Sequence, residues 1–226
     1  DGELVPADAG DRVLLAERGT PDEALVHAER VPQARVVSNP DRVAGAAQAR
    51  ASGAAVLVLD DAYQRLDVRR DLNIAVLSAE TSRAVRWPLP SGPWREGLPA
   101  LHRADFLIIT RKRAPAEEAV AYAHHLGRWT DAPTAVAHLE VSRYVGLRSG
   151  TIVPAEALAG QRVVAASGIA DPEAFIAQTK ATGAAVQAAT WRDHHDFRDE
   201  EVAWLAKAAR RADHLADAAE HHEIAV

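Results

Sequence analysis

Short apolar runs that alternate with helical segments are the feature that most constrains the fold of this chain. A continuous apolar run is typical of a strand in a parallel sheet that helices cover on both faces. Between two such runs, residues 41–52 predict a helix, because Asp41 stands at its start and Gly53 follows its end. The alternation favours an α/β fold. The runs of strand length are RVV at 35–37, AAVLVL at 54–59, LNIAVL at 72–77 and DFLIIT at 105–110.

The second half of the chain continues the pattern after a predicted helix at 115–127. Residues 134–147 (TAVAHLEVSRYVGL) alternate apolar and polar side chains, which predicts a strand with one exposed face. Strands are then expected at 161–169 and 184–191, and helices from Asp171 to about Thr182 and from about Asp199. We therefore expect three parts, namely an α/β domain at 1–133, a linker strand region at 134–150 and a smaller α/β domain at 151–226.

Composition excludes several classes of protein. The formal net charge is -6 with 26% charged residues, so the chain lacks the basic excess of nucleic-acid-binding proteins, and we expect no nucleic-acid partner. There is no cysteine, which excludes disulfides and thiolate metal sites. No run approaches the ~18 apolar residues of a membrane span, so we expect the chain alone to be soluble. Because it starts at Asp1 and contains no Met, we expect a fragment of a longer protein.

Two acidic residues, Asp60 and Asp61, follow directly after the apolar run at 54–59. Acids at the carboxyl end of a parallel strand indicate a ligand site. There they can hold Mg²⁺, which bridges phosphate oxygens during phosphoryl transfer. The alternative is a solvated strand end, since acids are common in such loops.

Six separated segments of the chain form an ordered series of motifs. They are GDRVLLA at 10–16, DDAYQRLDVRRDLNI at 60–74, LPSGPWRE at 89–96, LHRAD at 101–105, GIADPEAF at 168–175 and DHHDF at 193–197. In this order they resemble the tetraacyldisaccharide 4'-kinase family, which phosphorylates a lipid A precursor. The resemblance implies a P-loop NTPase-like parallel sheet with helices on both faces, plus a second, smaller α/β domain. It also implies ATP and Mg²⁺ as cofactors and tetraacyldisaccharide 1-phosphate as the substrate.

The resemblance assigns roles to acidic, amide and histidine residues. Asp60 and Asp61 match the acidic pair that handles Mg²⁺, with Gln64 beside the phosphate or substrate; the alternative for Gln64 is a loop-stabilising amide. Asp11 and His194 match the pair that activates the sugar hydroxyl. A carboxylate can orient a histidine, and the histidine can then accept the proton of the hydroxyl. Asp11 alternatively caps a helix that begins at VLLAER.

Arg95 and Glu96 match an arginine–glutamate pair of the family, and the resemblance implies that both bind substrate or phosphate and that Arg95 also takes part in catalysis. A guanidinium there can stabilise charge on the transferred phosphoryl group or hold an anionic substrate phosphate. The alternative is a surface ion pair. The loop that carries both residues is shaped by Pro90, Gly92 and Pro93.

The chain also departs from the family pattern. A GxxxxGK[ST] phosphate-binding loop is absent, so we assign no residue to cofactor binding and expect the first strand of the sheet to be missing. Arg12, Ala62 and Arg65 stand where the family has Glu, Gly and His, which puts the second acid and the tight turn beside the metal in doubt. A later TTEKD-type segment is not recognisable. We therefore expect truncation at both ends and reduced activity.

The resemblance places the parent protein at the cytoplasmic face of the bacterial inner membrane, with an apolar surface near the cleft that meets the bilayer. The oligomeric state stays open. One alternative is a degenerate, non-catalytic lipid-binding relative. It is supported by Arg12, by Ala62 and by the absence of the phosphate-binding loop. The other is a metal-dependent hydrolase, suggested by histidine pairs at 124–125, 194–195 and 221–222. Without an HExxH motif, and with His214, His221 and His222 expected on an exposed helix, a solvated face is favoured.

Overall fold

The chain divides into two compact units. The computed structural model describes residues 13–15, 24, 27–28, 31–84, 87–91, 94–146, 149–193, 195–212, 214–218 and 223–225. Residues 39–139 form one unit, called here the middle unit, and residues 1–38 with 140–226 form the other, called the terminal unit. Each unit has a hydrophobic core of its own.

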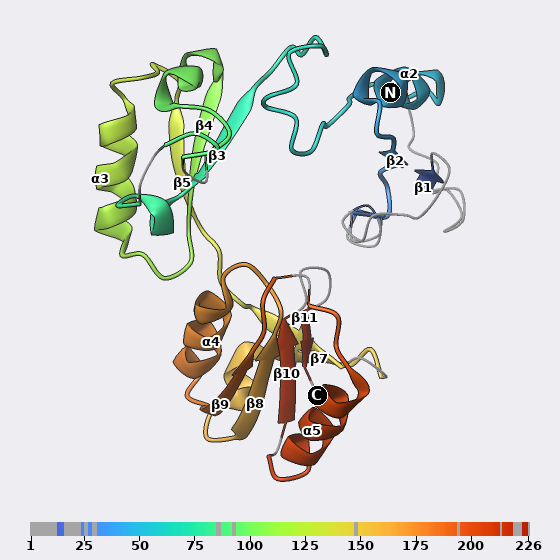
Figure 1. The fold of residues 1–226 in the computed structure, drawn as a ribbon, viewed down its shortest axis with the longest axis vertical. Coiled ribbons are helices and arrows are strands. Elements are labelled where there is room, and N and C mark those ends of the chain that lie inside the picture. Colours follow the sequence, from blue (N-terminus) through green and yellow to red (C-terminus); the bar gives the residue numbers. More distant parts are fainter. Residues whose placement is uncertain are drawn as a thin grey trace. The chain divides into compact units, whose positions relative to one another are not determined.

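The middle unit is built on a parallel sheet of three strands in the order β3-β4-β5. In the central strand, Leu107 and Ile109 alternate with less buried neighbours and are 1% and 0% exposed. Helix α3 connects β4 to β5 and packs Tyr122 and Leu126 into the same core (Figure 1). The elements are β3 (Ile74–Ser78), β4 (Phe106–Arg111), α3 (Ala116–Leu126), β5 (Thr134–His138) and the 3₁₀ turns η1 (Ala79–Thr81) and η2 (Leu98–Arg103).

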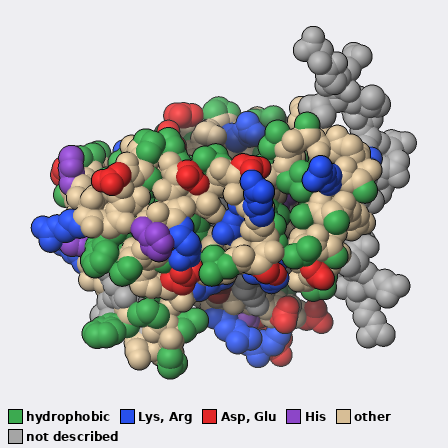
Figure 2. Space-filling view, turned by 90° about the horizontal axis from the view of Figure 1, so that it is seen from above, with side chains coloured by type: hydrophobic (Ala, Val, Ile, Leu, Met, Phe, Trp, Pro, Cys, Tyr) green, Lys and Arg blue, Asp and Glu red, His purple; other side chains and the backbone are tan. Residues whose placement is uncertain are grey.

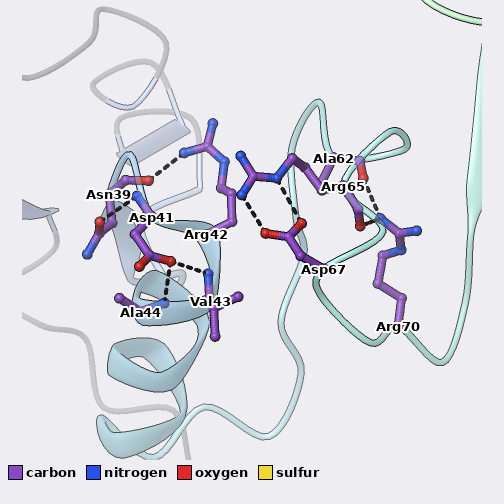
Figure 3. Close-up of polar contacts among 9 residues, drawn as sticks. All are labelled: Asn39, Asp41, Arg42, Val43, Ala44, Ala62, Arg65, Asp67 and Arg70. Atoms are coloured by element: carbon purple, nitrogen blue, oxygen red, sulfur yellow. Dashed lines mark hydrogen bonds and ion pairs between the residues drawn. The ribbon is translucent and has the colours of Figure 1, made fainter.

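Helix α2 (Arg42–Ala51) begins where the sequence predicts it. The Asp41 carboxylate accepts hydrogen bonds from the backbone N–H groups of Val43 and Ala44 at 2.9 and 3.1 Å, as Figure 3 shows. A side-chain oxygen at this position replaces the intrahelical partner that the first N–H groups lack. Gly53, at φ +89°, follows the helix in the left-handed conformation that glycine adopts without strain. The predicted helix at 41–52 is therefore confirmed.

The predicted buried strand at 54–59 is wrong. Among the residues that the structure describes, this run pairs with no strand, and its Val56 and Val58 side chains are 79% and 90% exposed. An apolar run forms a strand only where a neighbour accepts and donates its backbone hydrogen bonds. Within the described ranges, strand β3 pairs with β4 alone. In the described part of the chain, the run at 54–59 therefore forms no strand and begins with a bend at residues 55 and 56.

The terminal unit contains a mixed sheet of six strands in the order β7-β6-β11-β10-β8-β9. Strands β10, β8 and β9 are parallel, while β6–β7 and β10–β11 pair antiparallel. Helices α4 and α5 flank this sheet (Figure 1). The elements are β6 (Arg143–Val145), β7 (Ile152–Pro154), η3 (Ala155–Leu158), β8 (Arg162–Ser167), α4 (Pro172–Ala181), β9 (Ala185–Thr190), α5 (Asp199–Ala209), β10 (His214–Ala218) and β11 (Glu223–Ala225).

Strand β8 is the centre of the terminal core, because its residues from Val163 to Ser167 are all buried. Tyr144, Leu158 and Phe175 pack against it. Asp171 caps α4 by accepting the backbone N–H of Ala174 at 3.1 Å, which confirms the predicted helix start. A separate parallel pair is formed by β1 (Val13–Leu15) and β2 (Val36–Ser38).

Two expectations for the second half of the chain are corrected. Residues 134–147 do not form one strand, because β5 pairs with β4 in the middle unit and β6 pairs with β7 in the terminal unit. The expected linker at 134–150 thus begins inside a sheet, and the compact units divide after Leu139. The expected C-terminal helix is replaced after α5 by β10 and β11, since β8 offers an edge with which residues 214–218 pair in register.

The α/β class with parallel strands and helices is confirmed. Figure 2 shows acidic, basic and apolar side chains mixed on one face of the molecule, in line with a formal net charge of -6. In the described ranges, no helix combines the length and the apolar composition that crossing a membrane requires.

Candidate functional site

Five of the predicted site residues lie in the middle unit. Asp60, Asp61, Gln64, Arg95 and Glu96 are all described, whereas Asp11 and His194 lie outside the described residues. The alternative that a helix begins after Asp11 does not hold, because residues 13–15 form strand β1.

Asp61 and Arg95 come together although they are 34 positions apart. Arg95 Nη1 lies 2.6 Å from Asp61 Oδ2, and the two side chains are 57% and 61% exposed. Asp61 has φ +46°, the one positive φ of a non-glycine residue in the described part of the chain. Aspartate tolerates this left-handed conformation better than most residues do. The turn thus directs the Asp61 carboxylate toward the loop that carries Arg95.

The loop after Asp61 is held by its own arginines (Figure 3). Arg70 Nη1 donates hydrogen bonds to the backbone carbonyls of Ala62 and Arg65, the second at 2.7 Å. The Arg65 guanidinium donates to both carboxylate oxygens of Asp67, at 3.0 and 2.6 Å, and this hydrogen bonding lowers the pKa of Asp67. Ala62 itself is buried, at 4% exposed. These contacts within the chain fix the shape of the loop.

Glu96 and Arg95 do not pair with each other. Arg103 Nη2 donates to both Glu96 oxygens, at 2.9 and 2.8 Å, and the Arg103 guanidinium lies 5.0 Å from the centre of the Tyr63 ring. The Tyr63 hydroxyl donates to the carbonyl of Ala100 at 2.9 Å, and burial raises its pKa. Each residue therefore forms an ion pair with another partner, Arg95 with Asp61 and Glu96 with Arg103. Our assignment from sequence missed Arg103 and Tyr63, although the LHRAD and DDAY segments contain them.

Gln64 is half-buried, and its Oε1 atom is buried without a hydrogen-bond partner among the residues that the structure describes. A buried amide oxygen without a partner is costly. In the described part of the chain, this oxygen therefore makes no hydrogen bond that would support the loop-stabilising alternative for Gln64. A bound ligand could supply the missing donor.

The acidic pair has the donor chemistry that Mg²⁺ requires. Asp60 and Asp61 are exposed neighbours and offer hard carboxylate oxygens. Over the described ranges, no group of three or more histidine or acidic side chains is arranged to hold a metal. Mg²⁺ commonly takes one or two protein carboxylates and fills its other positions with water and phosphate oxygens, so this pair fits Mg²⁺ but not a closed zinc site.

In the terminal unit, the DHHDF segment is fixed by Glu201 at the start of α5. Glu201 accepts the backbone N–H of Arg198 at 2.9 Å and the indole N–H of Trp191 at 3.0 Å, and its Oε2 lies 2.9 Å from His195 Nε2. The Arg198 backbone bond is the main cause that lowers the pKa of Glu201 to about 2. The His195 ring stacks on Trp191 and meets Phe197 edge-on. The sequence assignment missed Glu201, because no motif contains it.

Gly168 lets this segment approach strand β8 closely. A Cβ atom at Gly168 would lie 3.4 Å from the Cβ of His195 and 3.5 Å from the carbonyl oxygen of Arg192. The backbone N–H of Trp191 also donates to the carbonyl of Ser167 at 2.8 Å. Two motif segments, GIADPEAF and DHHDF, therefore meet at the carboxyl end of β8.

Known proteins resemble the chain along most of its length. A family model described as tetraacyldisaccharide-1-P 4'-kinase matches residues 7–217. A tetraacyldisaccharide 4'-kinase from Rhodopseudomonas palustris (strain BisA53) is 37% identical over 205 residues, covering 89% of this chain and 54% of that protein. One from Geobacter sulfurreducens is 33% identical over 220 residues, covering 95% of this chain and 59% of that protein.

A solved structure is also similar. It is the crystal structure of "apo" form LpxK from Aquifex aeolicus in complex with ATP, at 29% sequence identity and a TM-score of 0.56. The match covers 79% of this chain and 53% of that one. The chain thus spans about half the length of the relatives that it matches.

Proposed function

Because the chain belongs to the tetraacyldisaccharide-1-P 4'-kinase family, as its six motif segments predicted, we propose that it takes part in ATP-dependent phosphorylation of a tetraacyldisaccharide 1-phosphate at the 4'-hydroxyl. The observation that carries the proposal is the contact between Asp61 and Arg95. It joins the two motif loops in which the family resemblance places the metal ligands and a phosphate-binding arginine.

The exposed Asp61–Arg95 pair suits an anionic substrate. The carboxylate holds one end of the guanidinium, and the remaining N–H groups of Arg95 can donate to phosphate oxygens in the fork geometry that arginine offers. In the proposal, Arg95 stabilises charge on the transferred phosphoryl group or holds a phosphate of the substrate. Gln64 contributes its amide to the same ligand, and Glu96 positions the loop through Arg103.

In this proposal the cofactors are ATP and Mg²⁺. Asp60 and Asp61 would hold Mg²⁺, which neutralises charge on the phosphates when bound. The similar LpxK structure contains ATP. No GxxxxGK[ST] sequence occurs in the 226 residues. We therefore assign no residue of this chain to binding of the nucleotide phosphates.

The acceptor hydroxyl needs a base. We propose Asp11 and His194 for this role. The histidine or the carboxylate accepts the proton of the 4'-hydroxyl as the hydroxyl oxygen attacks the γ-phosphorus of ATP, and the bond from that phosphorus to the β,γ-bridging oxygen breaks to release ADP. The motif match supports the assignment, and in the same motif His195 lies 2.9 Å from Glu201. Since the substrate carries acyl chains, we further propose that the reaction takes place at a lipid surface, the cytoplasmic face of the inner membrane.

A phosphorylation assay tests the proposal. The chain and a chimera that joins it to the unmatched remainder of the Rhodopseudomonas palustris relative are each incubated with tetraacyldisaccharide 1-phosphate, Mg²⁺ and γ-labelled ATP. We expect label in the lipid with the chimera, and a loss of about 10²-fold or more in kcat/KM for its Arg95→Ala variant. An unaltered rate in that variant would remove Arg95 from the mechanism.

The assay also decides between the enzyme and the non-catalytic alternative. If neither protein transfers phosphate but both still bind the lipid, the chain is a degenerate lipid-binding relative. Phosphate transfer that persists when EDTA removes divalent cations would contradict the Mg²⁺ assignment of Asp60 and Asp61.

A further inference from the structure

Two large apolar side chains stand out from the loop that precedes Arg95. Trp87 is 64% exposed and Leu89 is 65% exposed. Prolines 88 and 90 flank Leu89, so the described tip of this loop, residues 87–91, presents an almost entirely apolar surface. Single exposed apolar residues are common, but a tryptophan and a leucine beside each other on one loop tip are a candidate contact surface.

The backbone of this loop is closed by hydrogen bonds. The N–H of Leu89 donates to the carbonyl of Trp94 at 2.7 Å, and the N–H of Trp94 donates to the carbonyl of Trp87 at 3.3 Å. The N–H of Ser91 donates to the carbonyl of Pro88 at 3.0 Å. The apolar tip therefore has a defined base and does not depend on a binding partner for its shape.

The tip lies next to the proposed phosphate-binding arginine. The backbone N–H of Leu89 donates a hydrogen bond to the carbonyl of Trp94, and Arg95 directly follows Trp94 in the sequence. The backbones of Leu89 and Arg95 are therefore within about 10 Å of each other. An amphiphile that carries a phosphorylated head and acyl chains presents groups that complement both features, an anion for the guanidinium and hydrocarbon for the apolar tip. Resting on the proposed function, this arrangement fits a substrate that stays embedded in a lipid layer while its head group is bound.

The surface area that Trp87 and Leu89 can bury is small for a protein–protein interface. An aromatic side chain buries about 150–250 Å² at most, so two side chains fall far short of the roughly 1,000 Å² that a specific protein interface requires. Insertion into a lipid interface needs no such area, and tryptophan is enriched at that depth because its ring is apolar and its N–H is polar. We propose that Trp87 and Leu89 insert into the acyl region of a lipid surface and hold Arg95 at head-group level.

Vesicle binding tests this inference. The chain is sedimented with vesicles of phosphatidylethanolamine and phosphatidylglycerol, in the absence of ATP and disaccharide. We expect Trp87→Ser/Leu89→Ser to lower the partition coefficient about tenfold or more. The matched control Val56→Ser/Val58→Ser removes two still more exposed apolar side chains and is expected to bind within about twofold of the unaltered chain. Equal loss in both double variants, or no loss in the first, overturns the inference.

Two further measurements locate the contact. Brominated lipids should quench tryptophan emission in the chain, and Trp87→Phe should retain vesicle binding but lose most of the quenching. Unchanged quenching in that variant would assign insertion to another tryptophan and overturn the inference. Self-association that disappears in Trp87→Ser/Leu89→Ser, with vesicle binding intact, would assign the tip to a second copy. Because the vesicle assay involves no phosphate transfer, failure of the kinase assay leaves its result unaffected.

Discussion

At the scale of single residues, the contact between Asp61 and Arg95 orients side chains more than it stabilises the fold. Both partners are more than half exposed, and exposed ion pairs contribute about 0–1 kcal/mol because water and salt screen them. Arg103 differs, since it is 24% exposed, pairs with Glu96 and lies over the Tyr63 ring. The two arginines of neighbouring segments thus differ in their surroundings, and we propose ligand binding for Arg95 and loop support for Arg103.

We predict that Arg95→Ala changes the free energy of unfolding by less than about 1 kcal/mol, whereas Arg103→Ala lowers it by about 1–3 kcal/mol. The larger loss follows because Arg103→Ala leaves the half-buried Glu96 carboxylate without its partner. Urea unfolding of the two variants, followed by circular dichroism, measures the difference. Equal destabilisation would show that Arg95 is structural.

The backbone at Asp61 gives a second prediction. Its φ of +46° costs an ordinary L-residue about 1–2 kcal/mol and costs glycine almost nothing. Asp61→Gly should therefore retain the free energy of unfolding or raise it by up to about 1 kcal/mol, while Asp61→Val should lower it by about 1–2 kcal/mol. The same urea titration ranks the three proteins. A glycine variant less stable than the valine variant would contradict the left-handed turn.

At the scale of elements, Glu80 joins η1 to the connection between β4 and α3. Its Oε1 accepts backbone N–H groups of Lys112, Arg113 and Ala114 at 2.8, 2.8 and 2.9 Å, and its Oε2 accepts the Ser78 hydroxyl at 2.7 Å. Burial acts to raise the pKa of Glu80, but these hydrogen bonds together lower it from 4.5 to about 2. The carboxylate therefore fixes a loop whose N–H groups would otherwise lack a partner.

Glu80→Gln should lower the free energy of unfolding by about 1–3 kcal/mol at neutral pH, because the neutral amide accepts more weakly. The sign with pH follows from the lowered pKa. The Glu80 contribution is complete above the unfolded value of 4.5 and is lost as pH falls toward 2. Thermal unfolding measured from pH 7 to pH 2 should show the two proteins converging in this window. A constant difference would assign the effect to shape rather than charge.

Sequence patterns predicted the local features of the fold but not the features that depend on contacts between distant residues. The caps Asp41 and Asp171 were predictable, because an N-cap acts within three residues of its own helix. Glu80 was not, since its partners lie 32 to 34 positions away and no local pattern links them. The C-terminal strand β10 was taken for helix because its pairing with β8 is a tertiary contact. Motifs likewise identified Asp61 and Arg95 separately but not the contact between them, since 34 positions separate the two residues.

At the scale of the whole molecule, each compact unit has a separate core. Leu107 belongs to the core of the middle unit and Leu158 to that of the terminal unit, and both are 1% exposed. A leucine-to-alanine change at either position leaves a cavity and costs about 2–5 kcal/mol. Since the cores are distinct, each substitution should destabilise only the unit whose core contains the substituted leucine.

We predict two unfolding transitions in calorimetry. Leu107→Ala should lower the midpoint of one by roughly 10 °C or more and leave the other within about 2 °C, and Leu158→Ala should do the reverse. Each variant serves as the control for the other. A single transition that both variants shift equally would show that the units unfold as one cooperative body.

The exposed apolar run at 54–59 has a consequence for the solubility of the protein. Val56 and Val58 are exposed in the folded state, and on β3 the side chains of Ile74 and Val76 are 46% and 61% exposed. Uncharged β-branched segments and open strand edges are templates for intermolecular β-structure. Precipitation should therefore depend on protein concentration well below the unfolding temperature, and a single lysine in place of Val58 should raise solubility without altering the fold.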